Sequence, residues 1–207
     1  MELEKITDGY NQLERPRNSD SWTYIWGNDN FSSAKAYKAM VGINPSPPHF
    51  KWIWKTSCQP KHKVFFWLLL HDRLNTRNLL RRKSFIIDSY NCATLQCNVE
   101  ETLHHLFWTC PFAQRCWNFV CPNRAAGLST YEAIEDLKEN INLPFVMDII
   151  ILAAWSIWIV RNKKIFKQIT PSLPSWKDIY ASELNLLKFR IKKSLLQHFK
   201  DWLSLAL

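Results

Sequence analysis

Residues 90–121, YNCATLQCNVEETLHHLFWTCPFAQRCWNFVC, contain five of the six cysteines of the chain, and two adjacent histidines lie between them. Within this stretch Cys92, Cys97, His105 and Cys110 form a Cys-x4-Cys-x7-His-x4-Cys pattern. Three thiolates and one imidazole are the donors of a closed structural zinc site. The pattern therefore predicts that these four side chains bind Zn²⁺. The alternative is that the cysteines are small buried apolar side chains, as free cysteines often are.

The second half of this pattern is predicted to be helical. Thr102 is a suitable N-cap for a short helix that contains His105. Pro111 favours the first turn of the next helix, which would place Cys110 at the N-cap of that helix. Because a helix N-terminus stabilises negative charge, the thiolate of Cys110 should be favoured over its thiol.

A family resemblance rests on EETLHHLFWTCPFAQRCW, an upstream cysteine and the segment WKTSCQPKHKVFFWLLLHDRLNTRNLLRRK. Together they resemble the reverse transcriptase zinc-binding domain of plant LINE-type (non-LTR) retrotransposon polyproteins. The resemblance is clearest over residues 22–120 and continues more loosely through AAWSIWIVRNKKIF. It favours His105 over His104 as the ligand, because His105 occupies the family position before Leu-Phe. The family usually has Cys-x2-Cys before Glu-Glu-Thr, which would put the second cysteine at Leu95; here that cysteine is Cys97.

Length and composition predict a folded chain that is mainly α-helical. Of the 207 residues, 47% are hydrophobic and 11 are tryptophan, which is enough for a substantial core. Only four glycines argue against a sandwich or barrel, which needs many tight turns. We expect a short N-terminal β element, a central zinc-stapled knuckle and a long amphipathic C-terminal helix. The predicted segments are a polar leader (1–20), the zinc-binding-type domain (21–160) and a basic helical extension (161–207).

The N-terminal part is predicted to enter the domain through a strand, a turn and a helix. Residues 21–27, SWTYIWG, alternate aromatic and other residues, which is typical of a short strand. Residues 31–42 have a helical pattern, with Ser32 or Ser33 as the N-cap and Gly42 as the terminator.

A strongly apolar helix is predicted from Pro60 through KHKVFFWLLLHDRL. It is hydrophobic nearly all round and should be central to the core. We expect Trp67 and Leu68 to be deeply buried, on a face shared with Val64 and His71. Thr76 is predicted to cap the following helix, RNLLRRK.

Three further helices are predicted downstream. The first is a short helix in the acidic linker CPNRAAGLSTYEAIEDLKENINLP, with Ser129 or Thr130 as its cap. The run FVMDIIILAAWSIWIV contains Asp148 and is shorter than a bilayer span. We therefore expect a buried helix, although the following RNKK resembles a membrane stop signal. Apolar residues then recur every three or four positions over residues 176–206, which predicts one long helix with Ser175 as its cap. Its apolar face could dock onto the domain or onto a partner.

The net charge of +9 is concentrated in two basic blocks. Residues 51–83 contain nine Lys and Arg against one acidic residue, and residues 161–201 contain ten against three. Such concentration predicts a polyanionic partner, RNA or DNA, although an ordinary solvated surface is the alternative. The candidate contact residues are Lys61, Lys63, Arg73, Arg77, Arg81, Arg82 and Lys83. Similarity of this helix pair to DNA-binding helix-turn-helix proteins is only topological.

The sequence does not predict an enzyme. A reverse transcriptase uses paired aspartates to hold two metal ions, and the chain has no Asp-Asp dipeptide. A Cys–His nucleophilic pair such as Cys116 near His104 is an alternative, but no motif supplies an orienting third group.

The resemblance implies a non-catalytic, zinc-binding accessory domain of a retrotransposon reverse transcriptase. A different class of function is a structural module that docks the reverse transcriptase or other polyprotein domains, and a non-functional remnant is a further alternative. Basic blocks on one face would favour nucleic acid; dispersed charges with an open apolar patch would favour protein docking. No signal-peptide pattern is present, and the cysteine usage fits a reducing compartment. We therefore expect an intracellular protein, nuclear or cytoplasmic, without a membrane partner.

Overall fold

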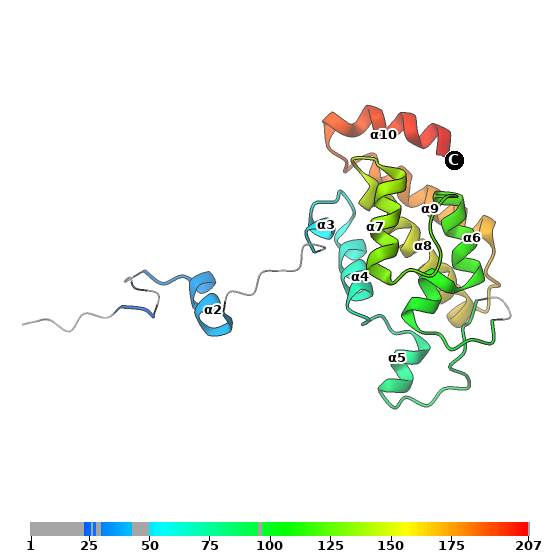
Figure 1. The fold of residues 1–207 in the computed structure, drawn as a ribbon, viewed down its shortest axis with the longest axis horizontal. Coiled ribbons are helices and arrows are strands. Elements are labelled where there is room, and N and C mark those ends of the chain that lie inside the picture. Colours follow the sequence, from blue (N-terminus) through cyan, green and yellow to red (C-terminus); the bar gives the residue numbers. More distant parts are fainter. Residues whose placement is uncertain (1–22, 26, 28–29, 43–49, 95–96, 207) are drawn as a thin grey trace, which may run out of the picture. The chain divides into compact units, whose positions relative to one another are not determined.

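The computed structural model of the chain describes residues 23–25, 27, 30–42, 50–94 and 97–206. The chain divides into two units, Met1–Ser46 and Pro47–Leu207 (Figure 1). Its described residues are mainly helical and include a single isolated β-bridge but no strand. The predicted mainly α class is confirmed.

The first unit contains helix α2 (Ser33–Val41). The Ser32 hydroxyl accepts a hydrogen bond from the Lys35 backbone N–H, and Gly42 ends the helix with a φ of 82°. Both predicted boundaries are therefore confirmed. Residues 23–25 and 27, the described part of the predicted strand, contain no strand. The predicted leader, residues 1–20, lies outside the described residues.

The second unit is a helical assembly around α8 (Val146–Lys167), and α4, α6, α7 and α9 each pack against this helix (Figure 1). Most side chains of α8 are buried, as predicted, and the predicted boundary between residues 160 and 161 lies inside it. In the part of the chain that is described, no helix combines the length and apolar character needed to cross a bilayer. The other elements are α3 (Phe50–Trp54), α4 (Pro60–Leu70), α5 (Arg77–Arg82), η1 (His105–Thr109), α6 (Pro111–Val120), α7 (Thr130–Ile141), α9 (Leu173–Leu187) and α10 (Lys193–Ala206).

The prediction of the buried face of α4 was wrong. Phe65, Phe66, Leu69 and Leu70 point into the core, whereas Trp67 and Leu68 are only half-buried. The Phe65 ring packs 5.2 Å from the Trp155 ring of α8, which fixes the inward face. Because α4 is apolar on nearly all sides, its sequence did not distinguish between the two faces.

The prediction of one long C-terminal helix was also wrong, because the chain forms α9 and α10 with a break at residues 188–192. A straight helix over residues 173–206 would be about 50 Å long and would extend beyond the core. The break lets α10 turn back, so that Phe199 and Trp202 pack against Phe145 at ring distances of 5.1 and 5.6 Å. The N-cap of α9 is Ser172 and not the predicted Ser175.

Candidate metal centre

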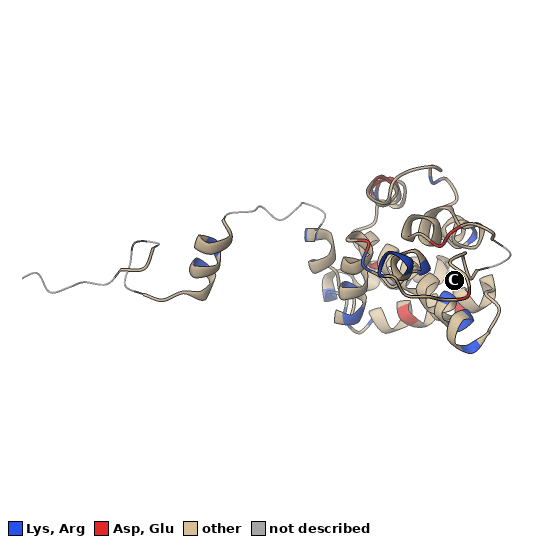
Figure 2. Ribbon diagram, turned by 90° about the horizontal axis from the view of Figure 1, so that it is seen from below, with Lys and Arg blue, Asp and Glu red and all other residues tan. Residues whose placement is uncertain are grey.

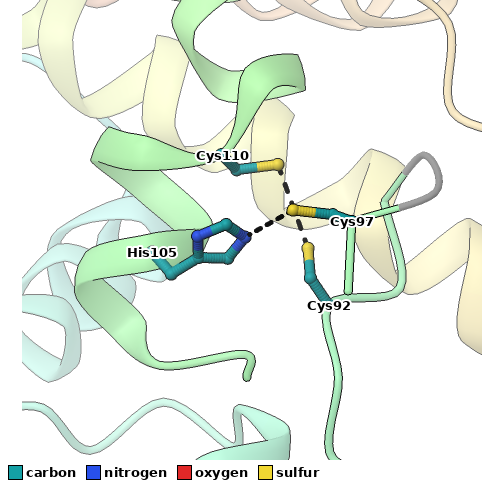
Figure 3. A group of neighbouring side chains, drawn as sticks. All are labelled: Cys92, Cys97, His105 and Cys110. Atoms are coloured by element: carbon teal, nitrogen blue, oxygen red, sulfur yellow. Dashed lines mark hydrogen bonds between the residues drawn. The ribbon is translucent and has the colours of Figure 1, made fainter. Parts of the chain in front are cut away.

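Four side chains from two neighbouring segments converge in the second unit, within what we call the cysteine knuckle (residues 91–110). Cys92 and Cys97 come from a loop, His105 from η1, and Cys110 from the residue before α6 (Figure 3). Their potential ligand atoms all lie within 4.8 Å of one another. The structure thus brings together the same four residues that the sequence pattern selected. Leu95, the usual family position of the second cysteine, lies outside the described residues.

Local hydrogen bonds explain how the knuckle places these donors. The loop is closed where the Cys92 N–H donates to the Val99 carbonyl at 2.8 Å. The His105 N–H donates to the Thr102 hydroxyl at 3.0 Å, which confirms the predicted cap. Cys110 is the N-cap of α6, again as predicted, and η1 is a π-helical turn of the kind often found at functional sites.

Two of the donor–donor distances are close to those around a tetrahedral ion. Zinc–sulfur bonds of about 2.3 Å at tetrahedral angles place two sulfurs about 3.8 Å apart. The Sγ atoms of Cys92 and Cys110 are 3.9 Å apart, and the Cys97 Sγ lies 3.2 Å from the His105 Nε2 (Figure 3). The other ring nitrogen of His105, Nδ1, lies 3.2 Å from the Thr109 hydroxyl. With Nδ1–H donating to that oxygen, Nε2 keeps its lone pair for a metal.

Of the three cysteine sulfurs, that of Cys110 is favoured as a thiolate. A hydrogen bond from the Cys92 thiol lowers the pKa of Cys110 to about 3, with burial opposing this shift. The pKa of Cys92 is raised, first by the hydrogen bond to Cys110 and then by burial. The Thr94 hydroxyl lies 2.9 Å from both sulfurs and can donate to one of them. One thiolate therefore forms readily, and a bound cation would favour loss of the remaining protons.

A buried ion pair, which the sequence did not predict, anchors the knuckle to α8. Glu101 and Arg161 have side-chain exposures of 0% and 3% and form a close salt bridge. Glu101 also accepts hydrogen bonds from the backbone N–H groups of Arg77, at 3.0 Å, and Ala93, at 3.3 Å. Arg161 in turn donates to the Asn75 carbonyl. One carboxylate thus fixes the cysteine loop against the start of α5 and the end of α8.

The cysteines and histidine outside the group have other environments. Cys58, Cys116 and Cys121 are buried, and burial raises the pKa of each thiol. His104 is exposed, and its Nε2 lies 2.9 Å from the Leu128 carbonyl oxygen. The alternative of a Cys116–His104 nucleophilic pair is therefore not supported, because Cys116 is enclosed in the core while His104 faces outward.

Most of the basic side chains predicted to contact nucleic acid have partners within the chain. Lys61 pairs with Glu183, Arg81 with Glu100, and Arg82 with Asp72. Arg77 donates to the Asn91 carbonyl and Lys63 to the Trp54 carbonyl. Arg73 and Lys83 are exposed, and among the described residues neither forms an ion pair.

The two basic blocks come together at both ends of α4. Before α4, Arg190 from the second block donates to the Ser57 carbonyl at 3.1 Å. Beyond the other end of α4, Arg77 and Arg161 line one cavity. Figure 2 shows Lys and Arg on several elements rather than along a single helix. The Lys and Arg side chains are thus distributed over several elements of the second unit.

A comparison with known proteins finds one protein family whose model matches the segment that contains the site. Residues 31–117 match the family model described as zinc-binding in reverse transcriptase. This zinc-binding domain match includes all four residues of the candidate site but less than half of the chain. No curated protein and no solved structure matches the chain. The similarity therefore supports a metal-binding role for the knuckle, while Arg161 lies beyond the matched segment.

The structure gives each residue of the Glu-Glu-Thr sequence a separate role within the matched zinc-binding segment. Glu100 accepts from the Asn78 side chain at 2.7 Å and pairs with Arg81 at 2.9 Å. Glu101 forms the buried pair with Arg161, and Thr102 caps the turn that carries the histidine ligand candidate. Glu100 therefore holds the knuckle to α5 and Glu101 holds it to α8, whereas Thr102 stabilises the turn within the knuckle.

Proposed function

We propose that the chain is a non-catalytic, zinc-binding accessory domain of a plant LINE-type retrotransposon reverse transcriptase, and that it binds nucleic acid. The observation that supports this most strongly is the convergence of three sulfurs and one imidazole nitrogen within the segment that matches the zinc-binding family.

The proposed role of zinc is structural. Cys92, Cys97, His105 and Cys110 would supply all four ligands, which leaves no coordination position for a substrate or an activated water. When bound, the ion would join the cysteine loop to η1 and to the start of α6. Zinc at such a site contributes directly to folding, because the four donors are dispersed in the unfolded chain.

The metal proposal is tested by measuring the zinc content of purified protein and its thermal unfolding before and after chelation. We expect one zinc per chain and a large loss of stability on removal, on the order of 10 kcal/mol in apparent free energy. Cys110→Ser should abolish stoichiometric binding, whereas Cys121→Ser, at a buried cysteine outside the group, should retain it. Equal zinc content in both variants would disprove the ligand assignment.

The nucleic-acid proposal rests on the net charge of +9 and on the two regions where the basic blocks meet. Binding should be mainly electrostatic, with little sequence preference. The logarithm of affinity should then fall linearly with the logarithm of salt concentration. Localisation in the nucleus or cytoplasm, where such a partner occurs, is part of the same proposal.

A matched pair of double variants tests this electrostatic binding. Replacing Arg73 and Lys83 by Gln should reduce the salt slope for duplex DNA by about two, roughly one for each lost phosphate contact. Replacing Arg115 and Lys138 by Gln removes the same charge outside both basic blocks and should leave the slope nearly unchanged. Absence of wild-type binding to RNA and DNA at low salt would refute the proposal.

A specific observation favours docking to a protein as the second candidate function. The outer face of α4 leaves Val64 51% exposed beside half-buried Trp67, and Trp54 of α3 is 59% exposed. A hydrogen bond between the Lys63 ammonium and the Trp54 carbonyl, at 3.4 Å, holds the two helices together. Val64→Glu should abolish binding to the reverse transcriptase polymerase domain if this face is used, and unchanged binding would exclude it.

A further inference from the structure

A cavity of about 610 Å³ lies between α5, the segment after it and the C-terminal half of α8. Its volume is within the range of sites that bind small ligands. The cavity is separate from the four candidate metal ligands, none of which lines it. The residues that line it include Arg77, Asp88, Trp158, Asn162, Phe166 and Gln168.

One side of the cavity is apolar and includes two aromatic rings. The Trp158 ring is half-buried and has the Arg161 guanidinium over it, 4.8 Å from the ring centroid. The Phe166 side chain is 78% exposed, so its ring is available to a ligand. Such rings form sequence-tolerant stacking surfaces for nucleobases. Asn162 and Gln168 add amide groups, which can donate to and accept from the edge of a base.

Arg77, one of the two arginines that line the cavity, forms no ion pair among the described residues. Arg77 uses one nitrogen, Nη1, to donate to the Asn91 carbonyl at 2.8 Å, and a guanidinium has further donors. Lys163, Lys164 and Lys167 of α8 lie on the opposite side of the helix from the lining residues and do not line the cavity. The charge of Arg161 is balanced by Glu101, and Asp88 is the acidic residue of the lining. An apolar floor beside the Arg77 guanidinium is complementary to a base attached to a phosphate.

We propose that this cavity receives an unpaired base of a single-stranded nucleic acid, with Phe166 as a stacking surface and Arg77 near the adjoining phosphate. The inference deepens the proposed nucleic-acid function and rests on it. A base in a duplex is stacked and paired with its neighbours, so only a single strand, loop or end offers one freely. The zinc-loaded domain should consequently bind a single strand more tightly than an abasic strand with the same number of phosphates.

The test measures binding of zinc-loaded full-length protein to fluorescein-labelled 12-nucleotide strands, one with thymine bases and one abasic. Phe166→Ala should weaken binding to the thymine strand about five- to tenfold, because one stacking surface is lost. It should leave binding to the abasic strand unchanged. Phe189→Ala is the matched control, since Phe189 is 86% exposed and does not line the cavity. Asp88→Asn should strengthen binding to both strands about two- to threefold by removing a repulsive charge.

Each outcome separates this inference from the broader proposal. If wild-type protein binds the strands but Phe166→Ala behaves like Phe189→Ala, the cavity holds no base, while nucleic-acid binding still stands. If thymine and abasic strands bind equally well, the inference is likewise overturned. If wild-type protein binds neither strand nor duplex, the proposed function itself fails. An effect of Phe166→Ala only on binding to the polymerase domain would identify a protein side chain as the occupant and overturn the inference.

Discussion

Breaking the buried ion pair between Glu101 and Arg161 should strongly destabilise the second unit. In the Arg161→Met variant the Glu101 carboxylate, with a side-chain exposure of 0%, would lose its cationic partner. Its remaining partners would be the backbone N–H groups of Arg77 and Ala93, at 3.0 and 3.3 Å. Removal of one member of such a buried pair typically costs about 3–5 kcal/mol, because the other charge is left uncompensated. This is a large fraction of the about 5–15 kcal/mol that stabilises a typical domain.

The neighbouring exposed ion pair provides a control. Arg81 and Glu100 are 2.9 Å apart, with side-chain exposures of 54% and 31%, so Arg81→Met should cost less than about 1 kcal/mol. Both variants can be compared with wild type by urea unfolding of the zinc-loaded protein, with tryptophan fluorescence as the signal that monitors unfolding. Arg161→Met should also weaken zinc binding in competition with a chelator, because Glu101 holds the loop through the Ala93 N–H.

The reasoning is refuted if Arg161→Met and Arg81→Met cost the same, or if zinc affinity is unchanged in both. The double variant Glu101→Gln with Arg161→Met sharpens the test. Since it removes both charges, its cost should be less than the sum of the two single costs by about 0.5–3 kcal/mol. Additive costs would mean that the two side chains are not energetically coupled, despite their contact.

Two other predictions concern α4. The Phe66 ring is fully buried, so Phe66→Ala should lower the free energy of unfolding by about 3–5 kcal/mol, measured by urea unfolding. Trp67→Ala should lower it distinctly less, because Trp67 is half-buried. A larger loss for Trp67→Ala would disprove the assignment of the inward face. Burial lowers the pKa of His62 to about 4, with Glu183 opposing the shift and Lys61 and Arg190 reinforcing it. Stability should therefore fall as the pH drops from about 6.5 toward 4, by about 1–2 kcal/mol between pH 7 and 5. The His62→Gln variant should not show this loss of stability at low pH when it and the wild type are unfolded by urea at several pH values. Identical pH profiles for the two proteins would show that His62 does not cause the loss.

Local features of the fold could be predicted from the sequence because the chemistry of a helix end depends on a few adjacent residues. Ser32, Thr76 and Ser129 each accept a hydrogen bond from a backbone N–H of the helix that follows. Cys110 and Pro111 likewise mark the start of α6. The pattern of the candidate metal ligands was recognisable for the same reason, since its four residues fall within 19 consecutive positions.

The orientation and length of helices were less predictable, because they depend on packing between distant segments. The apolar residues of α4 surround the helix, and only contact with α8 and η1 determines that Phe65 faces inward. Between α9 and α10 no proline or glycine marks the break. It follows from the packing of Phe199 against Phe145, a contact that neither segment indicates alone.

The buried pair was missed for a related reason, and it changes how the basic charge should be interpreted. Arg161 begins the RNKK sequence, which resembles a membrane stop signal and opens the second basic block, yet its charge is balanced by Glu101 in the interior. Glu183 and Asp72 similarly compensate Lys61 and Arg82. A phosphate contact releases counterions only where a cation is available to it. The salt slope should therefore be smaller than the number of Lys and Arg in the two blocks suggests.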